Sequence, residues 1–128
     1  LGMAEGFLRI IPEAIVAHIG LRRNEETLEP EVYYPNPSVN FPDSHTIILD
    51  PMLATGGSAI ETVRILKEQG ASRIAFACVI AAPEGVRALQ AAHPDLPVFI
   101  AALDRGLNEK GYICPGLGDA GDRSFGTI

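Results

Sequence analysis

The chain has 128 residues, of which 47% are hydrophobic and 6% aromatic, and its formal net charge is −6. This length fits one domain or a part of one, and the composition predicts a core of aliphatic side chains. The acidic balance and the lack of a long basic run argue against a nucleic-acid surface. No apolar stretch approaches the ~20 residues of a membrane-spanning helix. We therefore expect neither a nucleic-acid nor a membrane partner.

The two cysteines, Cys78 and Cys114, are too few for a disulfide framework or a four-ligand metal site. Cys78 lies within an apolar run, which predicts a buried thiol. Cys114 lies in a glycine-rich segment and is expected to be more accessible. Reduced thiols are typical of the cytoplasm, which is the location that we predict.

The first third of the chain is predicted to hold a helix, a strand and an arm. Apolar residues recur with helical spacing in 3–11, and Pro12 ends that helix. Residues 15–21 are expected to form a strand. The polar residues 22–30 follow it, and residues 32–38 suggest an extended β-arm with a turn.

The rest of the chain alternates strands with helices. Strands are predicted at 46–49, 74–80 and 97–103, and helices at 58–69 and 83–93. This alternation predicts an α/β fold, with a parallel sheet flanked by helices in a single domain that spans residues 1–128. The C-terminal residues are glycine-rich and show little periodicity.

Ligands of such sheets bind at the carboxyl ends of the strands. Three features are predicted to lie at such ends, namely Asp50, residues 81–85 and Asp104. The carboxyl edge of the sheet is therefore where we expect a site.

The most informative stretch, Asp-Pro-Met-Leu-Ala-Thr-Gly-Gly-Ser at 50–58, joins a predicted strand to a predicted helix. Its small residues let backbone N–H groups approach an anion, and the helix N-terminus adds a favourable field. Thr55 and Ser58 add hydroxyl donors, and Asp50 can accept hydrogen bonds from sugar hydroxyls. The stretch therefore predicts a site for a phosphorylated sugar. The simpler alternative, an ordinary strand–helix turn, would suit a bare Thr-Gly-Gly-Ser, and Asp50 and Pro51 favour the functional interpretation.

This stretch resembles the ribose-phosphate loop of the type I phosphoribosyltransferases, and its residue order resembles their uracil phosphoribosyltransferase branch. The resemblance implies that nine consecutive residues bind the ribose-phosphate donor: Asp50, Pro51, Met52, Leu53, Ala54, Thr55, Gly56, Gly57 and Ser58. Most relatives open the loop with two acids, whereas Pro51 stands second here. Mg²⁺, the implied cofactor, is therefore expected to bind mainly through the donor diphosphate rather than through protein ligands.

A second dense stretch, residues 111–123, is rich in glycine with one proline, which predicts irregular backbone rather than a helix or strand. It resembles the uracil-binding loop of the same family, whose backbone groups can match the polar edge of a small flat base. The resemblance implies base contacts from Ile113, Gly118, Asp119 and Ala120, with Asp119 also near the ribosyl donor. Arg23 matches a family arginine that contacts the donor diphosphate.

The resemblance covers nearly the whole chain and implies a pentosyltransferase of pyrimidine salvage. Its reaction makes UMP and diphosphate from uracil and 5-phospho-α-D-ribose 1-diphosphate, with Asp50 and Asp119 as the catalytic residues. A homo-oligomer and allosteric GTP are implied as well. The arm at 24–45 is expected to close over the site and exclude water.

Two alternatives to this function stay open. A non-catalytic nucleotide-sensing module of a regulator or kinase fusion is one, although Asp50, Thr55, Ser58 and Asp119 are all present. A purine phosphoribosyltransferase is another, although it would normally keep the acid pair that Pro51 interrupts. The chain opens with Leu1-Gly2-Met3, without an initiating Met or a signal peptide, so we expect a fragment that lacks the family's N-terminal region and diphosphate loop.

Overall fold

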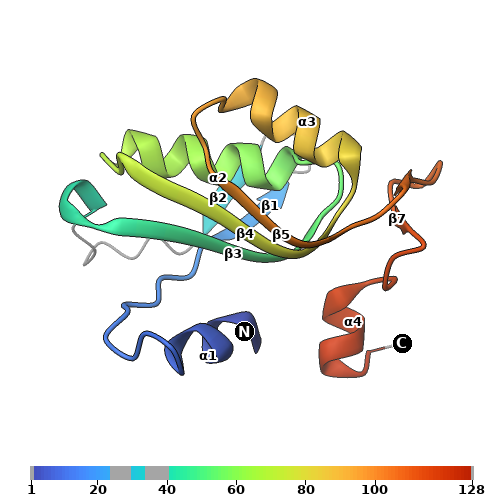
Figure 1. Cartoon of the computed structure of the whole chain (residues 1–128), viewed down its shortest axis with the longest axis horizontal. Coiled ribbons are helices and arrows are strands. Elements are labelled where there is room, and N and C mark those ends of the chain that lie inside the picture. Colours follow the sequence, from blue (N-terminus) through green and yellow to red (C-terminus); the bar gives the residue numbers. More distant parts are fainter. Residues whose placement is uncertain (1, 24–29, 34–40, 128) are drawn as a thin grey trace.

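Three long apolar strands form a parallel sheet in the order β3-β4-β5 (Figure 1). The computed structural model describes residues 2–23, 30–33 and 41–127. The sheet strands are β3 (His45–Leu53), β4 (Arg73–Ala81) and β5 (Val98–Leu103). Their helical connections are α2 (Gly57–Glu68) and α3 (Pro83–Ala92). The other described elements are α1 (Gly2–Leu8), β1 (Gly20–Arg23), β2 (Pro30–Tyr33), the 3-10 turn η1 (Phe41–Asp43), β6 (Gly106–Leu107), β7 (Ile113–Cys114) and α4 (Ala120–Phe125).

Helices α2 and α3 lie together on one face of the sheet, and the core fills the space between the two layers (Figure 1). In α2 the apolar residues Ala59, Val63 and Leu66 recur at helical spacing and are buried. They belong to one buried cluster with Phe76, which is fully buried in the central strand β4, and with Leu89 of α3. Phe76 lies opposite Ile48 of β3 and Val98 of β5, and it is the largest of the fully buried side chains, so we take it as the centre of the core.

Gly70 ends α2 as predicted. Its φ of +90° places it in the left-handed region, which suits glycine. Its N–H donates to the carbonyl of Lys67, and the N–H of Ala71 donates to that of Leu66 at 2.9 Å. The chain therefore reverses directly into β4, which makes the β3-α2-β4 unit compact.

The opposite face of the sheet carries exposed apolar side chains. Ile47, Val79 and Phe99 project from it, with 42%, 42% and 62% of their surface exposed. They alternate along the strands with the buried residues of the other face. Helices α1 and α4 lie on this side (Figure 1). Parallel sheets are normally covered on both faces, so this face is unusually open for the described part of the chain.

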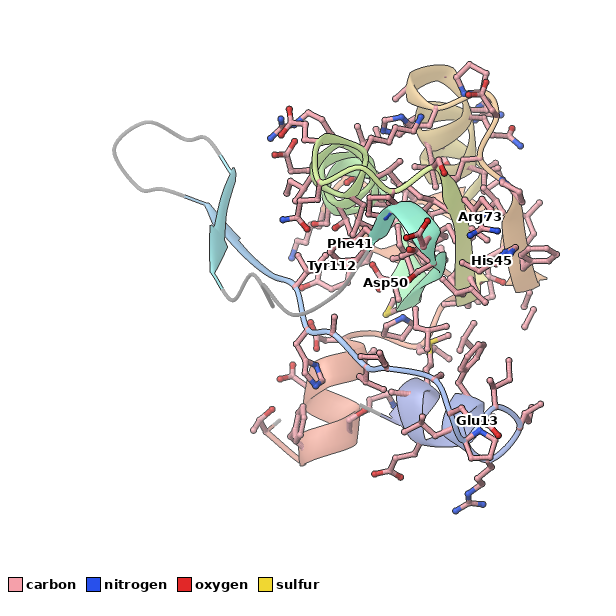
Figure 2. All side chains as sticks on the ribbon, turned by 90° about the vertical axis from the view of Figure 1, so that its left-hand side faces the viewer. Glu13, Phe41, His45, Asp50, Arg73 and Tyr112 are labelled. Atoms are coloured by element: carbon pink, nitrogen blue, oxygen red, sulfur yellow. The ribbon has the colours of Figure 1, made fainter. Side chains whose placement is uncertain are left out.

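Polar side chains join the amino ends of β3 and β4, at the end of the sheet remote from the predicted site. Arg73 opens β4 and lies beside His45, which opens β3, with 3.1 Å between Nη1 and Nε2 (Figure 2). Its Nη2 also donates to the carbonyl of Asp43 at 2.6 Å. The two strands are therefore held in register at their amino ends by side chains as well as by backbone.

The α/β fold and the central strands and helices confirm the expectations from sequence. Three expectations were wrong in part. The strand predicted at 15–21 begins only at Gly20, and β3 continues past Leu49 through Asp50 to Leu53. Residues 111–123, predicted to be irregular, contain β7 and the first residues of α4.

The predicted arm appears as an antiparallel pair, in which Gly20 of β1 lies opposite Tyr33 of β2. Its remaining residues, 24–29 and 34–40, lie outside the described part, so the predicted closure of the arm over the site stays a prediction. Within the described ranges, no helix has the length and apolar character needed to cross a membrane.

Replacing Phe76 by alanine is expected to destabilise the protein by about 3–5 kcal/mol, because a fully buried aromatic side chain leaves a cavity. The matched control is Phe99→Ala on the open face, where the change should stay within about 0.5 kcal/mol. Urea unfolding followed by circular dichroism measures both. Equal losses for the two variants would contradict the central place of Phe76 in the core.

Candidate functional site

The turn from β3 into α2 encloses a pocket of about 280 Å³, lined by Asp50 and residues 52–59. Leu53 ends β3 and is buried, which anchors one side of the loop. Gly56, with φ +90°, turns the chain into α2 and provides no side-chain cap for the helix. The first amides of a helix have no partner within it, so those of residues 57–59 remain as donors at the pocket. Together with the helix field they suit an anion.

Two glycines fix the shape of this loop by bringing it against α3. A Cβ added to Gly85, in the first turn of α3, would lie 2.2 Å from the carbonyl oxygen of Ala54. A Cβ on Gly56 would lie 3.0 Å from the carbonyl oxygen of Gly85. Side chains at these positions would therefore push the loop and helix apart. The sequence pattern locates Gly85 at a strand end and assigns it no role, and only the close approach shows why a glycine stands there.

Asp50 lies inside β3, opposite Cys78 of β4, rather than at the strand's end as predicted. Its Oδ1 accepts a hydrogen bond from the N–H of Met52 at 3.1 Å, which orients the carboxylate in the pocket lining. Burial raises the pKa of Asp50, and the bond from Met52 opposes this more weakly. The structure therefore holds a partly desolvated carboxylate beside amides that suit an anion.

Burial and the charge of Asp50 together raise the pKa of the Cys78 thiol to about 11. Cys78 is buried, as predicted, and Cys114 is partly exposed. Cys78 is therefore an uncharged core residue under the pocket rather than a nucleophile.

The amino-terminal end of the glycine-rich segment 111–123 approaches the loop between β3 and α2. A Cβ on Gly111 would lie 3.8 Å from the methyl group of Thr55. Ile113 of β7 is buried in a small cluster with Ile80 and Ala82, and Met52 and Ala54 pack against that cluster. The structure thus brings the predicted base-binding Ile113 against the predicted donor-binding loop, although the two motifs lie some fifty residues apart in sequence.

Residues 118–120 do not line this pocket. Gly118 has φ +77°, and Asp119 caps α4, its Oδ1 accepting from the N–H of Asp122 at 2.9 Å. Helix α4 lies on the side of the sheet opposite α2 and α3 (Figure 1). The predicted base contacts of Gly118, Asp119 and Ala120 stay predictions. The helix itself corrects the expectation of an irregular backbone through 111–123.

Arg23 is the last residue of β1, opposite Pro30 of β2. Its side chain lies outside the described part of the structure, so the predicted diphosphate contact is not tested. Among the described residues, no group of three or more His, Cys, Asp and Glu side chains comes together. Asp50 is the one carboxylate among the residues that line the pocket.

Replacing Gly85 by alanine is expected to weaken binding of ribose 5-phosphate at least tenfold, because the added methyl group would displace the Ala54 carbonyl and the loop. Gly6→Ala is the matched control, since a Cβ at Gly6 in α1 meets nothing within 4 Å. Isothermal titration of both variants measures the difference. Unchanged affinity in Gly85→Ala would show that the close approach does not shape the loop.

Replacing Asp50 by asparagine is expected to stabilise the free protein at pH 7 while weakening ribose 5-phosphate binding. The raised pKa means that the ionised carboxylate costs stability, and this cost appears as the pH rises above the ordinary value of 3.8. The stability difference between the variant and the parent should therefore shrink towards pH 4.

Urea unfolding between pH 4 and 7 measures that difference. The exposed Asp95, replaced by asparagine, is the control. A variant less stable than the parent at pH 7 would contradict the assignment of a desolvated charge at Asp50.

The chain is similar in sequence to known proteins of one family. The family model described as uracil phosphoribosyltransferase matches residues 1–127. A uracil phosphoribosyltransferase of Anoxybacillus flavithermus is 58% identical over 127 residues, which cover 99% of this chain and 61% of the relative. One of Lachnoclostridium phytofermentans is 59% identical over 125 residues, which cover 98% and 60%. The chain thus spans about three fifths of the length of these relatives.

Solved structures agree on the fold. The AQ2163 protein from Aquifex aeolicus superposes with a TM-score of 0.81 at 40% identity, over 94% of this chain and 57% of that one. The adenine phosphoribosyl transferase from Trypanosoma brucei, solved with AMP, pyrophosphate and ribose-5-phosphate, gives a TM-score of 0.51 at 15% identity, over 89% of this chain and 54% of that one. This second likeness concerns the fold alone. With a family model that matches nearly every residue, the chain belongs to the uracil phosphoribosyltransferase family.

Proposed function

We propose that the protein of which this chain forms the whole or a part is a uracil phosphoribosyltransferase, which makes UMP and diphosphate from uracil and 5-phospho-α-D-ribose 1-diphosphate. The observation that carries the proposal is the contact between the two motifs, where Gly111 approaches Thr55 and Ile113 packs near Met52 and Ala54. An anion-binding loop and a candidate base-binding segment that meet in this way suit a nucleotide. Family membership supports the same choice of base.

In this proposal the ribose-phosphate half of the ligand lies in the pocket. The amides of residues 57–59 and the hydroxyls of Thr55 and Ser58 hold the 5′-phosphate. Asp50 accepts hydrogen bonds from the ribose hydroxyls, and its bond from Met52 keeps it oriented before the ligand arrives. The remaining residues of the stretch shape the loop through their backbone; they are Pro51, Met52, Leu53, Ala54 and Gly56.

The reaction breaks the bond between C1′ and the diphosphate oxygen and forms a bond between C1′ and N1 of uracil, which loses its proton. Bond breaking ahead of bond making gives C1′ an oxocarbenium character. The protein then acts mainly by positioning, which can supply up to ~7–11 kcal/mol of the barrier. Asp119 is proposed to favour the positive charge on the ribose ring, as preorganised charges do.

Mg²⁺, when bound through the donor diphosphate, neutralises negative charge on the leaving group. Of the residues that line the pocket, Asp50 supplies the only carboxylate, so the residues present fit a metal held chiefly by the substrate. Arg23 is proposed to contact the same diphosphate. By the same resemblance we propose a homo-oligomer in the cytoplasm, with GTP as an allosteric ligand.

Calorimetric titration of the chain with UMP tests the proposal, with GMP as the control ligand. We expect selective binding of UMP, because this nucleotide spans both half-sites. Asp119→Ala is expected to weaken UMP binding. Asp122→Ala is the matched control, since Asp122 Oδ1 accepts from the Thr127 hydroxyl at 2.7 Å and so also stabilises the end of α4, but it has no proposed ligand contact.

Two outcomes would contradict the proposal. One is a folded chain, as judged by circular dichroism, that binds no UMP, which would favour a nucleotide-sensing or degenerate module. The other is equal affinity for UMP and GMP, which would remove the assignment of uracil. Asp119→Asn keeps an oxygen that can cap α4, so it separates the charge of Asp119 from its capping bond.

A further inference from the structure

The hairpin β6–β7 is the shortest sheet element of the described chain, with two residues in each strand. Leu107 pairs with Ile113, and Gly106 with Cys114. A strand pair of this length is only marginally stable if its own backbone hydrogen bonds alone hold it together. Yet it carries Ile113 and leads directly to Gly118, Asp119 and Ala120, which are the proposed base contacts. Something outside the hairpin must therefore fix its position.

Asp104 supplies one such contact. Its Oδ2 accepts a hydrogen bond from the N–H of Gly116 at 2.8 Å, in a half-buried setting. Its own N–H donates to the carbonyl of Ala81, at the carboxyl end of β4, at 2.8 Å. The carboxylate that binds Gly116 is therefore itself attached to the sheet.

The contact falls at the point where the chain leaves the hairpin. Gly116 has φ +61°, and a Cβ there would lie 2.0 Å from the carbonyl oxygen of Ile113. The turn is thus tight, with no room for a side chain at Gly116. The bond from the Gly116 N–H ties this turn to Asp104 at the point where the chain continues towards Gly118.

Glu84 supplies a second contact, at the start of the hairpin. Its Oε1 accepts a hydrogen bond from the N–H of Leu107 at 3.2 Å. A Cβ on Gly106 would lie 2.8 Å from the same oxygen, so the carboxylate rests directly on β6. Hydrogen bonds from its own backbone N–H and from Leu107 lower the pKa of Glu84, so the acceptor stays ionised.

The place of Glu84 in the fold connects this contact to the pocket. The next residue, Gly85, is the one that packs against the Ala54 carbonyl. Two consecutive residues in the first turn of α3 thus contact the two halves of the site, Gly85 the ribose-phosphate loop and Glu84 the hairpin. Asp104 connects the hairpin to the sheet as well, because it binds both Gly116 and the carbonyl of Ala81.

We propose that Asp104 and Glu84 are positioning residues, which set the separation between the phosphate-binding loop and the base-binding segment without contacting the ligand. This inference rests on the proposed function, because it assumes that the two halves bind one nucleotide. A ligand that spans both halves depends on their separation. A ligand that fills only the loop does not.

The test compares UMP with ribose 5-phosphate in the same variants. Asp104→Ala is expected to weaken UMP binding about tenfold or more and to change ribose 5-phosphate binding less than twofold. Asp104→Asn should restore UMP affinity, because the amide oxygen can accept the same bond from Gly116. Glu84→Ala, at an exposed position, should show the same selectivity with a smaller loss. Asp95→Ala is the control for an exposed acid that makes neither contact.

A second measurement does not depend on any ligand. Amide hydrogen exchange of the free chain should become faster at Gly116 in Asp104→Ala and at Leu107 in Glu84→Ala, while α2 keeps its protection. If Asp104→Ala does not fold, Glu84→Ala and Asp104→Asn carry the test.

The proposal is overturned if the variants lose UMP and ribose 5-phosphate affinity equally, or if UMP affinity and amide exchange are both unchanged. A parent chain that binds ribose 5-phosphate but not UMP contradicts the proposed function instead. The exchange rates at Gly116 and Leu107 then decide whether the two acids hold the hairpin.

Discussion

The close approach of α3 to the loop after β3 is the constraint on which the rest of the site depends. The first turn of α3 leaves no room for a side chain at Gly85, so the Ala54 carbonyl lies directly against the helix backbone. The loop then enters α2 through Gly56, whose conformation is left-handed and whose own neighbours are again Gly85 and Ala88. Helix α3 therefore does more than cover the sheet. It sets where the amides at the start of α2 lie.

Three carboxylates, those of Asp50, Asp104 and Glu84, lie in or near the site and differ in their surroundings. The carboxylate of Asp50 is partly desolvated and accepts one backbone hydrogen bond. Desolvation of the ionised carboxylate lowers the stability of the folded protein. Proteins accept such costs where a ligand later supplies the missing partners. Asp104 and Glu84 differ from Asp50, because each already accepts a backbone N–H bond outside the pocket. This geometry suits the positioning role proposed for Asp104 and Glu84, and the geometry of Asp50 suits the ligand contact proposed for it.

Much of the fold could be predicted from sequence, because apolar periodicity carries the signal for β3, α2, β4, α3 and β5. The errors have physical causes. Asp50 and Pro51 are not typical strand residues, so the sequence predicts an end of β3 at Leu49. The parallel pairing with β4 nevertheless continues past them to Leu53 and Ala81. Helix α4 has six residues and a sequence rich in glycine and polar side chains, so its cap at Asp119, not its periodicity, accounts for it. The turn between β3 and α2 was predictable for a different reason, since small residues between a strand and a helix are typical of a turn that suits an anion. The contacts of Gly85, Glu84 and Asp104 were not predictable, because each joins segments far apart in sequence.

The groups proposed to bind the phosphate are backbone amides and two hydroxyl groups, and none of them gains or loses a proton near neutral pH. The charge state that matters for this part of the site is then that of the ligand, since a phosphate monoester loses its second proton at a pH of about 6. In the proposed complex, the response to acid at this end of the site would therefore come from the ligand rather than from the protein. Protonation of the phosphate would weaken its binding without changing the groups proposed to receive it.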